Sequence, residues 1–390
     1  MKLLKAKCYN PGNKVAIEKE PLINDIKFNI IKFNDKECPK DKKDKVVICC
    51  FSEFGCEIVG VMYAFNFIKK RFPDKYLIVA GWYGRSYLYQ HLVDEFWEID
   101  ESFMWLREYA RAFHHKSNNL KSLEKELRNL SDNFVASDDF GKMLVLARCK
   151  SCKRHISATN KINNCVSCKS YDIIQSVYGD VASYRSLAMP IPSPSQDKIL
   201  EAKKYLGNNP VGIFARGRKC YGRNLPKEFY INLIKLLRDI GYEPIWLGEK
   251  QSVIECPVDD IVDFSRKEES RDLELTLAII KQLNFTIQFW TASTRLSAIM
   301  NTPYILFESP DQIWGGGQEG IRLNLTTFGP KKLLISHYLN ALDNQEKTLE
   351  IVNQAINELN NKNYNEIFAL LENEDVVKLL KQQNNLRIGG

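Results

Sequence analysis

The sequence predicts an α/β protein built from two similar halves, each a parallel sheet covered by helices. Residues 46–80 and residues 211–247 each read as strand, loop, helix and strand. That order is typical of βαβ units. A further observation is a repeated Cys-x-x-Cys motif within residues 149–168, which predicts a metal-binding insertion in the first half.

Length and composition favour a folded protein of two or three domains. The chain has 390 residues, of which 44% are hydrophobic and 11% aromatic, so it can bury sizeable cores. Its formal net charge of +7 is modest for this length. Such a charge suits small anionic ligands and does not by itself imply nucleic acid or a membrane surface.

The cysteines and the N-terminus suggest a reducing compartment. Eleven cysteines are spread irregularly along a chain that shows no secretory signal. No apolar run approaches the ~20 residues of a membrane span. We therefore expect a cytoplasmic protein in which clustered cysteines bind metal and do not form disulfides.

In the first half, residues 46–51 form a short apolar run that reads as a buried parallel strand. A helical pattern follows over residues 58–72, and residues 76–80 read as a second strand that ends at a glycine. Residues 86–147 read as mainly helical, with one apolar stripe over 120–130. Upstream, residues 26–33 suggest a strand or hairpin.

In the second half, an apolar strand over residues 211–215 leads directly into a loop, 216–223, that carries four cationic side chains and two glycines. A helix over 227–240 and a strand over 243–247 follow. In parallel sheets ligands bind beyond the carboxyl ends of the strands. The loop therefore has the chemistry and the position to bind a diphosphate, although a solvated cationic loop is the simpler alternative.

A second anion site is predicted further along the same half. Residues 285–289 read as a strand, and Thr291, Ser293 and Thr294 stand at the start of the helix that follows. A helix N-terminus offers free backbone N–H groups and the positive end of a dipole, and the hydroxyls add donors. The alternative is ordinary N-capping by these side chains.

The two Cys-x-x-Cys pairs are the most specific motif in the chain. Cys149 and Cys152 are separated by twelve residues from Cys165 and Cys168. Two such pairs supply four thiolates for a closed tetrahedral site, so we predict structural Zn²⁺. His155 is an alternative ligand or a surface residue, and the basic residues of this segment would also suit contact with nucleic acid or a protein partner.

Three short motifs give the chain a resemblance to a known family. They are Gly55-Cys56-Glu57, the basic loop 216–223, and residues 291–296. The chain resembles the GT-B glycosyltransferases and is most similar to their heptosyltransferase-like group. Those proteins carry Gly-Asp after the first strand, a basic loop after the first strand of the second half, and a helix start of the form Asp-Ser-Gly-x-x-His-Leu-Ala.

The chain departs from the family pattern in each half. The family's first Asp is replaced by Glu57, one residue later, while Trp290 stands at the second Asp and Arg295 at the His. The cysteine pairs lie outside the family pattern and read as an insertion. The departures are compatible with altered specificity or with lost activity.

The resemblance implies an inverting, metal-independent transfer of a sugar from a nucleotide donor to an acceptor hydroxyl. A carboxylate takes the proton of that hydroxyl, and cations and backbone donors stabilise the leaving diphosphate. Glu57 is the first candidate base because this position faces the cleft between the halves in the fold, and Glu53 is the second. Either could instead cap the following helix.

The resemblance also implies a set of donor-binding residues in the second half. Arginines can grip phosphate bidentately, and the hydroxyls of the helix start would hold the second phosphate. Gly248 and Glu249 would approach the base or the ribose, and Glu308 the ribose. The complete set is Arg216, Arg218, Lys219, Arg223, Gly248, Glu249, Thr291, Ser293, Thr294, Arg295 and Glu308.

We accordingly predict three regions. Residues 1–189 form a Rossmann-like acceptor domain with a zinc ribbon at 147–171, residues 190–335 form a Rossmann-like domain for the nucleotide-sugar, and residues 336–390 form helices that pack back on the domains. The co-substrate is a nucleotide-sugar. A glycan is the favoured acceptor, with nucleic acid or a protein as alternatives.

Two other classes compete with a glycosyltransferase. In the first, the zinc ribbon is the working surface of a nucleic-acid-associated protein and the α/β halves are a scaffold. In the second, the first half belongs to a methyltransferase or another nucleotide-cofactor enzyme. Against the second, residues 52–57 hold a single glycine and no Gly-x-Gly-x-x-Gly pattern.

Overall fold

The chain divides into two compact units in a computed structural model. Unit 1 comprises Met1–Lys7 and Val15–Pro192, and unit 2 comprises Cys8–Lys14 and Ser193–Gly390. The structure describes residues 21, 23, 25–52, 54–58, 65, 68–69, 71–108, 110–111, 114–115, 117–136, 145–149, 151, 155–158, 173–176, 191–217, 224–250, 252–289, 291–307, 334–337 and 345–360. No helix among these residues is long and apolar enough to span a membrane.

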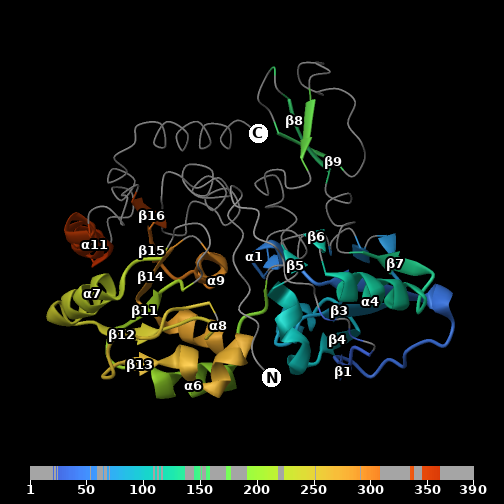
Figure 1. Cartoon of the computed structure of the whole chain (residues 1–390), viewed down its shortest axis with the longest axis horizontal. Coiled ribbons are helices and arrows are strands. Elements are labelled where there is room, and N and C mark those ends of the chain that lie inside the picture. The colour runs from blue at the N-terminus through green and yellow to red at the C-terminus, as the bar shows by residue number, and fades with distance from the viewer. Residues whose placement is uncertain are drawn as a thin grey trace. The chain divides into compact units, whose positions relative to one another are not determined.

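Unit 1 is built on a five-stranded sheet in the order β1-β4-β3-β2-β7 (Figure 1). The strands are β1 (Phe28–Lys32), β2 (Lys45–Cys50), β3 (Tyr76–Gly81), β4 (Glu95–Ile99) and β7 (Asn133–Val135). Strand β1 pairs antiparallel with β4, and the other neighbours are parallel. The predicted strand over 26–33 is therefore an antiparallel edge strand.

The long helix of unit 1 shows why its sequence folds as it does. Helix α4 (Asn118–Arg128) begins at Ser117, whose side chain accepts a hydrogen bond from the amide of Leu120. Leu120, Leu123 and Leu127 recur at helical spacing and are buried against one face of the sheet. Short helices α1 (Phe54–Cys56) and α3 (Ser86–Tyr89) follow β2 and β3, and the predicted helix over 58–72 lies mostly outside the described residues.

The prediction that residues 86–147 are mainly helical was wrong for part of that range. The segment contains β4 and β7 of the main sheet, the 3₁₀ helix η3 (Glu101–Glu108), and the short pair β5 (Ala110–Arg111) and β6 (His114–His115). Strand β4 escapes a search for apolar runs because two of its five residues are glutamates, and both are buried.

A separate three-stranded antiparallel sheet in unit 1 has the order β10-β8-β9. It is formed by β8 (Val145–Cys149), β9 (His155–Ala158) and β10 (Ile173–Ser176). Strands β8 and β9 form a hairpin in which Arg148 pairs with His155, and Ile173 of β10 pairs with Cys149.

Unit 2 is built on a six-stranded parallel sheet in the order β13-β12-β11-β14-β15-β16 (Figure 1). Its strands are β11 (Pro210–Phe214), β12 (Glu243–Trp246), β13 (Val262–Asp263), β14 (Phe285–Phe289), β15 (Tyr304–Phe307) and β16 (Leu334–His337). Numbered along this unit, the order is 3-2-1-4-5-6, the doubly wound arrangement of nucleotide-binding sheets.

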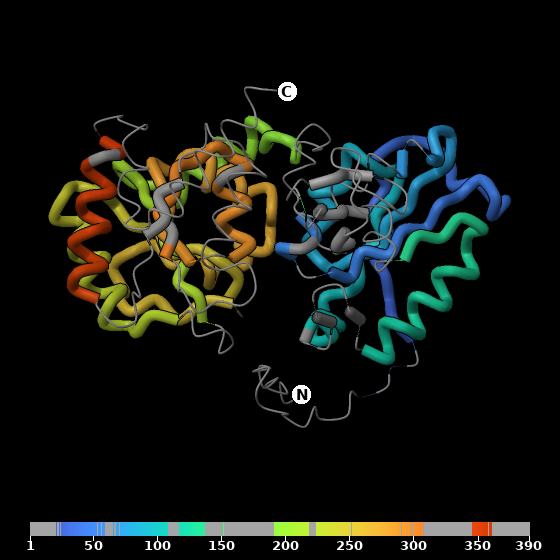
Figure 2. The backbone as a smooth tube through the Cα atoms, turned by 90° about the horizontal axis from the view of Figure 1, so that it is seen from above, coloured from blue at the N-terminus to red at the C-terminus, as the bar shows by residue number. Residues whose placement is uncertain are grey.

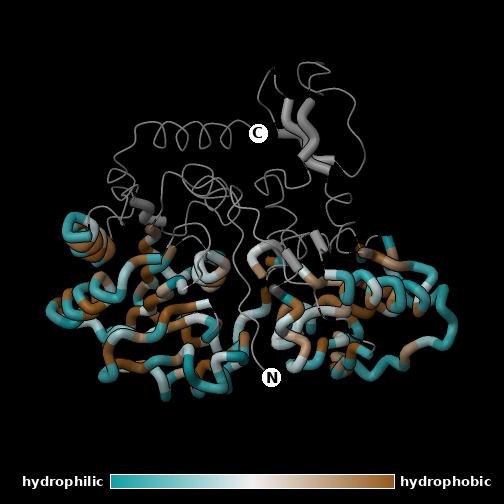
Figure 3. The backbone as a smooth tube through the Cα atoms, viewed as in Figure 1, coloured by the Kyte–Doolittle hydropathy of each residue, from teal (hydrophilic) through white to brown (hydrophobic). Residues whose placement is uncertain are grey.

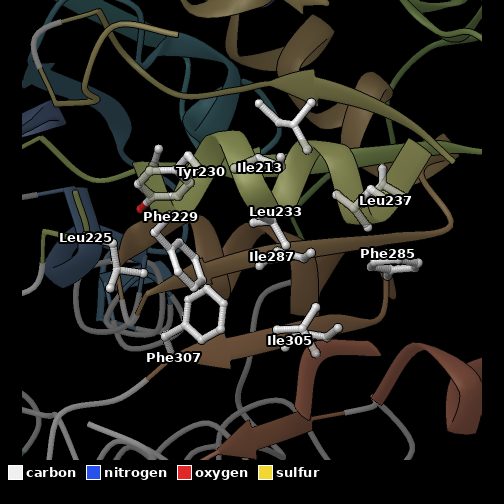
Figure 4. Packing of buried hydrophobic residues seen from close by; sticks show 14 of the residues in the cluster. Ile213, Leu225, Phe229, Tyr230, Leu233, Leu237, Phe285, Ile287, Ile305 and Phe307 are labelled. Atoms are coloured by element: carbon white, nitrogen blue, oxygen red, sulfur yellow. The ribbon is translucent and has the colours of Figure 1, made fainter. Parts of the chain in front are cut away.

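One face of the unit 2 sheet holds the larger core. Helix α7 (Lys227–Asp239) presents Phe229, Leu233 and Leu237 to the strands, where they meet Ile287 and Phe307 (Figure 4). Helix α11 (Gln345–Asn360) packs on the same core, and Figure 2 shows it alongside α7. In both units the hydrophobic stretches are concentrated in the strands (Figure 3).

The opposite face of the unit 2 sheet is covered by α8 (Leu273–Gln282) and α9 (Ala292–Ile299). Helix α6 (Gln196–Ala202) packs on α8 and continues into the 3₁₀ helix η5 (Lys203–Tyr205). Helices on both faces leave the two ends of the parallel strands as the places where loops and ligands can gather.

The core of unit 2 gives a direct test of the fold. Leu233 on α7 is fully buried among the strands, so Leu233→Ala should lower the free energy of unfolding by about 2–5 kcal/mol because it removes apolar contacts and leaves a cavity. Urea unfolding measures the change. Lys235→Ala, on the exposed side of the same helix, should change the stability by less than about 0.5 kcal/mol; equal effects would contradict this packing.

Candidate functional site

The carboxyl edge of the unit 2 sheet has a topological switch point between β11 and β14. The chain leaves β11 to form β12 and β13 on one side, and then returns to form β14 on the other. The two strands end at the same level, because Phe214 pairs with Gln288. The segments that follow them, from Ala215 and from Thr291, therefore begin side by side, at the point where such sheets bind ligands.

The start of the loop after β11 is held firmly. Arg216 is only 6% exposed, and its Nη1 donates to Oδ1 of Asn224 at 3.1 Å. The amide of Gly217 donates to the carbonyl of Ser252 at 2.8 Å. A Cβ at Gly217 would lie 2.6 Å from the nitrogen of Ile254, so the close approach of this segment requires glycine.

The end of β12 lies beside this loop. Gly248 has a φ of +123° and a side chain there would collide with Val253, so the turn requires glycine. The carbonyl of Glu249 accepts the amides of Ser252 and Val253 at 2.7 and 3.2 Å, and its side chain is exposed. Both predicted residues lie at the carboxyl edge of the sheet, and their contact with a base or ribose remains a prediction.

The hydroxyls at the start of α9 divide between two roles. Thr294 is fully buried, and its Oγ1 accepts the amide of Thr291 at 3.3 Å and donates to the carbonyl of Phe289 at 3.2 Å. Oγ1 of Thr291 and Oγ of Ser293 lie 2.5 Å apart. Thr294 is thus a structural cap, and its own amide donates to the carbonyl of Thr291 at 3.2 Å. Thr291 and Ser293 stand at the first turn of α9, the part of a helix whose amides commonly bind anions.

A buried polar cluster, which sequence reasoning missed, fixes this helix start. Oγ of Ser297 lies 3.0 Å from Oγ1 of Thr286, and Nε2 of Gln288 donates to both at 3.2 and 3.0 Å. Ser297 also donates to the carbonyl of Ser293 at 3.1 Å. The available signal was the alternation of Thr286 and Gln288 with apolar residues along β14. The cluster anchors α9 to the sheet.

The remaining predicted donor residues are only partly described. Arg295 lies on α9 with a half-buried side chain. Four others lie outside the described residues: Arg218, Lys219, Arg223 and Glu308. Their role in binding a donor remains a prediction.

At the carboxyl edge of the unit 1 sheet, the predicted base Glu57 lies in a closed network. It is fully buried, its Oε2 pairs with Nη1 of Arg85, and its Oε1 accepts from the hydroxyl of Tyr89 at 2.5 Å. The guanidinium of Arg85 lies over the ring of Phe54, 3.9 Å from its centroid. The partners of Glu57 among the described residues are thus side chains that follow β3.

Burial dominates the electrostatics of this network. Desolvation raises the pKa of the Glu57 carboxyl, and the charges of Arg85 and Arg107 and the hydrogen bond from Tyr89 oppose that rise. Burial also raises the pKa of Tyr89, which therefore stays a neutral donor. A raised pKa suits a base, whereas a fully buried pair is also a structural device. Glu57 as the base remains a prediction, and Glu53 lies outside the described residues.

A second carboxylate at the same edge was absent from the sequence-based candidates. Glu98 on β4 is 8% exposed, and its Oε1 accepts the amide of Gly84 at 2.8 Å. It forms no ion pair with any residue that the structure describes. Burial raises the pKa of Glu98. The sequence feature that could have identified Glu98 is a glutamate inside the short apolar segment 96–99.

The predicted zinc site is described only at its first ligand. Cys149 is the last residue of β8, and Cys152, Cys165 and Cys168 lie outside the described residues. Within the described part of the chain, no group of three or more His, Cys, Asp or Glu residues is placed to hold a metal. The four-cysteine site therefore remains a prediction.

Comparison with known proteins finds similarity among solved structures. No family model matches the chain, and no curated protein matches it. A glycosyl transferase family 9 protein from Veillonella parvula is similar at 11% identity and a TM-score of 0.44, over 80% of this chain and 91% of that one. The E. coli heptosyltransferase WaaC with ADP is similar at 13% identity and a TM-score of 0.42, over 81% and 99%.

A third similar structure is E. coli ADP-heptose lps heptosyltransferase II, at 12% identity and a TM-score of 0.42, over 81% of this chain and 98% of that one. All three belong to the group that the sequence motifs resemble. The site described above rests on the chain's own residues.

The buried network of unit 1 makes a prediction about stability. Glu57→Gln would leave the Arg85 guanidinium buried without its carboxylate, so we expect a loss of about 3–5 kcal/mol in the free energy of unfolding. Chemical denaturation measures this loss. The double variant Glu57→Gln/Arg85→Met should recover much of it, because no uncompensated charge remains. A single variant as stable as the wild type would show that the pair contributes nothing.

Proposed function

We propose that the chain is a glycosyltransferase that binds a nucleotide-sugar at the carboxyl edge of the unit 2 sheet. The observation that carries this proposal is the switch point between β11 and β14. It brings together two segments that were chosen from the sequence on independent grounds: the basic loop from Arg216 and the hydroxyl-bearing helix start from Thr291. Their meeting at one edge supports a shared anionic ligand.

The chemistry of the edge suits a diphosphate. Amides and hydroxyls at the start of α9 would donate hydrogen bonds to one phosphate, and the cations of the loop after β11 would bind the other. Because the buried cluster beneath α9 fixes these donors before a ligand arrives, they would stabilise developing charge on the leaving group with little reorganisation. Gly248 and Glu249 would then lie toward the nucleoside, at the end of the next strand.

The transfer we propose is inverting and needs no metal for its chemistry. The acceptor oxygen forms a bond to the anomeric carbon, the bond from that carbon to the diphosphate oxygen breaks, and its electron pair leaves with the nucleoside diphosphate. A carboxylate takes the acceptor's proton. The sequence offers Glu57 and Glu53 for this step, and a glycan as the acceptor. Nucleic acid as acceptor is the second choice.

Nucleotide binding tests this proposal. A ligand that binds only the folded state raises the apparent stability, so a thermal-shift panel of UDP, GDP, ADP, CMP and S-adenosylmethionine should show stabilisation by one nucleoside diphosphate. Stabilisation by S-adenosylmethionine alone would favour the methyltransferase alternative. If no ligand of the panel stabilises the protein and it binds polynucleotide in a salt-dependent way, the nucleic-acid-binding alternative is favoured.

A substitution at the helix start locates the binding. Thr291→Val removes one hydroxyl that would contact phosphate and should weaken the binding of that nucleoside diphosphate about 10- to 100-fold, as loss of a hydrogen bond to a charged group does. Titration calorimetry measures the Kd. Thr276→Val on α8 is the matched control, because its hydroxyl bonds only the carbonyl of Asp272 among described residues. Equal affinities of the two variants would indicate that the nucleotide binds away from Thr291.

We also propose that the four cysteines hold a structural Zn²⁺. The strands around them support this, because β8 ends at Cys149, β9 starts at the same end of the sheet, and Ile173 of β10 pairs with Cys149. The second cysteine pair ends five residues before β10, since Cys168 precedes Ile173 by five. These connections would allow both cysteine pairs to reach one end of this small sheet, as a four-thiolate site requires.

Metal analysis tests the zinc proposal. Purified protein should contain about one zinc per chain, as a single four-thiolate site binds. Cys149→Ser should lower that content and destabilise the β10-β8-β9 sheet, because such sites contribute folding free energy. Cys256→Ser in unit 2 is the control. A metal-free wild-type protein with unchanged folding would contradict the proposal.

A further inference from the structure

The strand neighbours of Glu98 at the carboxyl edge of the unit 1 sheet are neutral residues. Across the sheet Glu98 stands in one row with Cys50, Gly81 and Asn29, because these residues pair in register. Gly81 cannot carry a side chain, since a Cβ there would lie 2.9 Å from Cζ of Phe96. The carboxylate therefore has an aromatic ring and a glycine below it, and no cation beside it in the described part of the chain.

The hydrogen bonding of the Glu98 carboxylate differs from that of Glu57. Glu57 has both oxygens engaged, by Arg85 and by Tyr89. Among the described residues, the Glu98 carboxylate accepts one hydrogen bond, from the amide of Gly84 to Oε1, and none of these residues donates to its Oε2. A carboxylate that is more than nine-tenths buried and has one neutral donor lacks most of what its charge requires. Such a group has the means to bind a ligand that brings its own donor.

A second polar group at this edge also lacks a partner. Oγ of Ser52 is buried and has no hydrogen-bond partner among the described residues. Ser52 follows β2, and its carbonyl accepts from Nε1 of Trp82 at 3.0 Å, in the segment that follows β3. A carboxylate oxygen with no described donor and a buried hydroxyl with no described partner thus lie at two strand ends of the same edge, an arrangement that suits a ligand site.

We propose, on the basis of the glycosyltransferase function proposed above, that Glu98 contacts the acceptor hydroxyl and takes its proton. Oε2 of Glu98 accepts a hydrogen bond from the acceptor O–H. As the acceptor oxygen bonds to the anomeric carbon, the proton moves to Oε2 and the electron pair of the breaking carbon–oxygen bond leaves with the nucleoside diphosphate. Glu98 later releases the proton to solvent.

In this proposal Glu57 is a positioning residue. Its pair with Arg85 fixes the segment after β3, and the preceding residue, Gly84, supplies the amide that holds Glu98. Gly84 has a φ of +75°, a conformation that favours glycine. The two carboxylates are thus linked through adjacent residues of one turn.

The folded-state titration of Glu98 tests the assignment without a substrate. Titratable groups on the elements next to Glu98 include Lys32, Lys45, Cys50, Tyr76, Arg85, Tyr89 and Glu95. Among the described contacts, no hydrogen bond or ion pair joins any of them to Glu98. Because burial raises the folded-state pKa of Glu98 above its unfolded value, the stability it contributes is complete below the unfolded pKa of about 4.3 and is lost as pH rises through the folded pKa. Glu98→Gln removes this loss.

We therefore expect the melting temperature of Glu98→Gln to exceed that of the wild type by about 2–4 °C at pH 8, and by less at pH 5. Glu95→Gln is the matched control on the same strand: Glu95 is also buried but accepts hydrogen bonds from Tyr76 and Trp97, so its substitution should destabilise. A Glu98→Gln variant that is destabilised like Glu95→Gln, or a difference that does not change with pH, would overturn the proposal.

The catalytic role of Glu98 is tested by hydrolysis, with water as the acceptor. The substrate is the nucleotide-sugar that contains the nucleoside diphosphate found to stabilise the wild type. Glu98→Gln should release nucleoside diphosphate about 10²–10⁴-fold more slowly while its Kd for the nucleotide is unchanged. Release at the wild-type rate would overturn the proposal. If no nucleotide binds the wild type, the proposed function fails, whereas the pH dependence still decides whether Glu98 is an unpaired carboxylate.

Discussion

The parallel order of the unit 2 sheet is the constraint on which the functional account depends. Parallel strands place every following loop at one edge, and the 3-2-1-4-5-6 order separates neighbouring loops at a single point. Around that point the chain is rigid for identifiable reasons. Gly217 admits the close approach of the segment before Ile254, and hydroxyls and an amide beneath α9 fix its first turn. A diphosphate would meet donors that are already in place.

The carboxyl edge of the unit 1 sheet carries different chemical groups. Unit 1 places two buried carboxylates there in unequal environments, and such inequality is how proteins assign distinct roles to chemically identical groups. Glu57 is satisfied by a cation and a phenol, and it holds a turn. Glu98, on β4, has one neutral donor among the described residues. Because both oxygens of Glu57 are occupied, Glu57 has less capacity than Glu98 to accept a hydrogen bond from an acceptor hydroxyl.

The sequence allowed much of the fold to be predicted, and less of the site. The βαβ pattern is visible because strands β2, β3, β11 and β12 are apolar and helix α7 has a clear stripe, as expected for sheets buried on both faces. Strand β4 was missed because buried glutamates interrupt it. The tertiary contact that supplies the Tyr76 hydroxyl to Glu95 is invisible to a local pattern. For the same reason sequence motifs singled out Glu57 and passed over Glu98, whose environment is made by Gly84 and Phe96.

Hydrogen–deuterium exchange of the full chain, with and without a saturating nucleoside diphosphate, measures most directly whether the nucleotide binds at the switch point of the unit 2 sheet. Bound ligand slows exchange of the amides it contacts or encloses. The account predicts protection concentrated at residues 215–217 and 291–296, on the two sides of the switch point. Protection confined to unit 1, or none at these two segments while the nucleotide is bound, would contradict it.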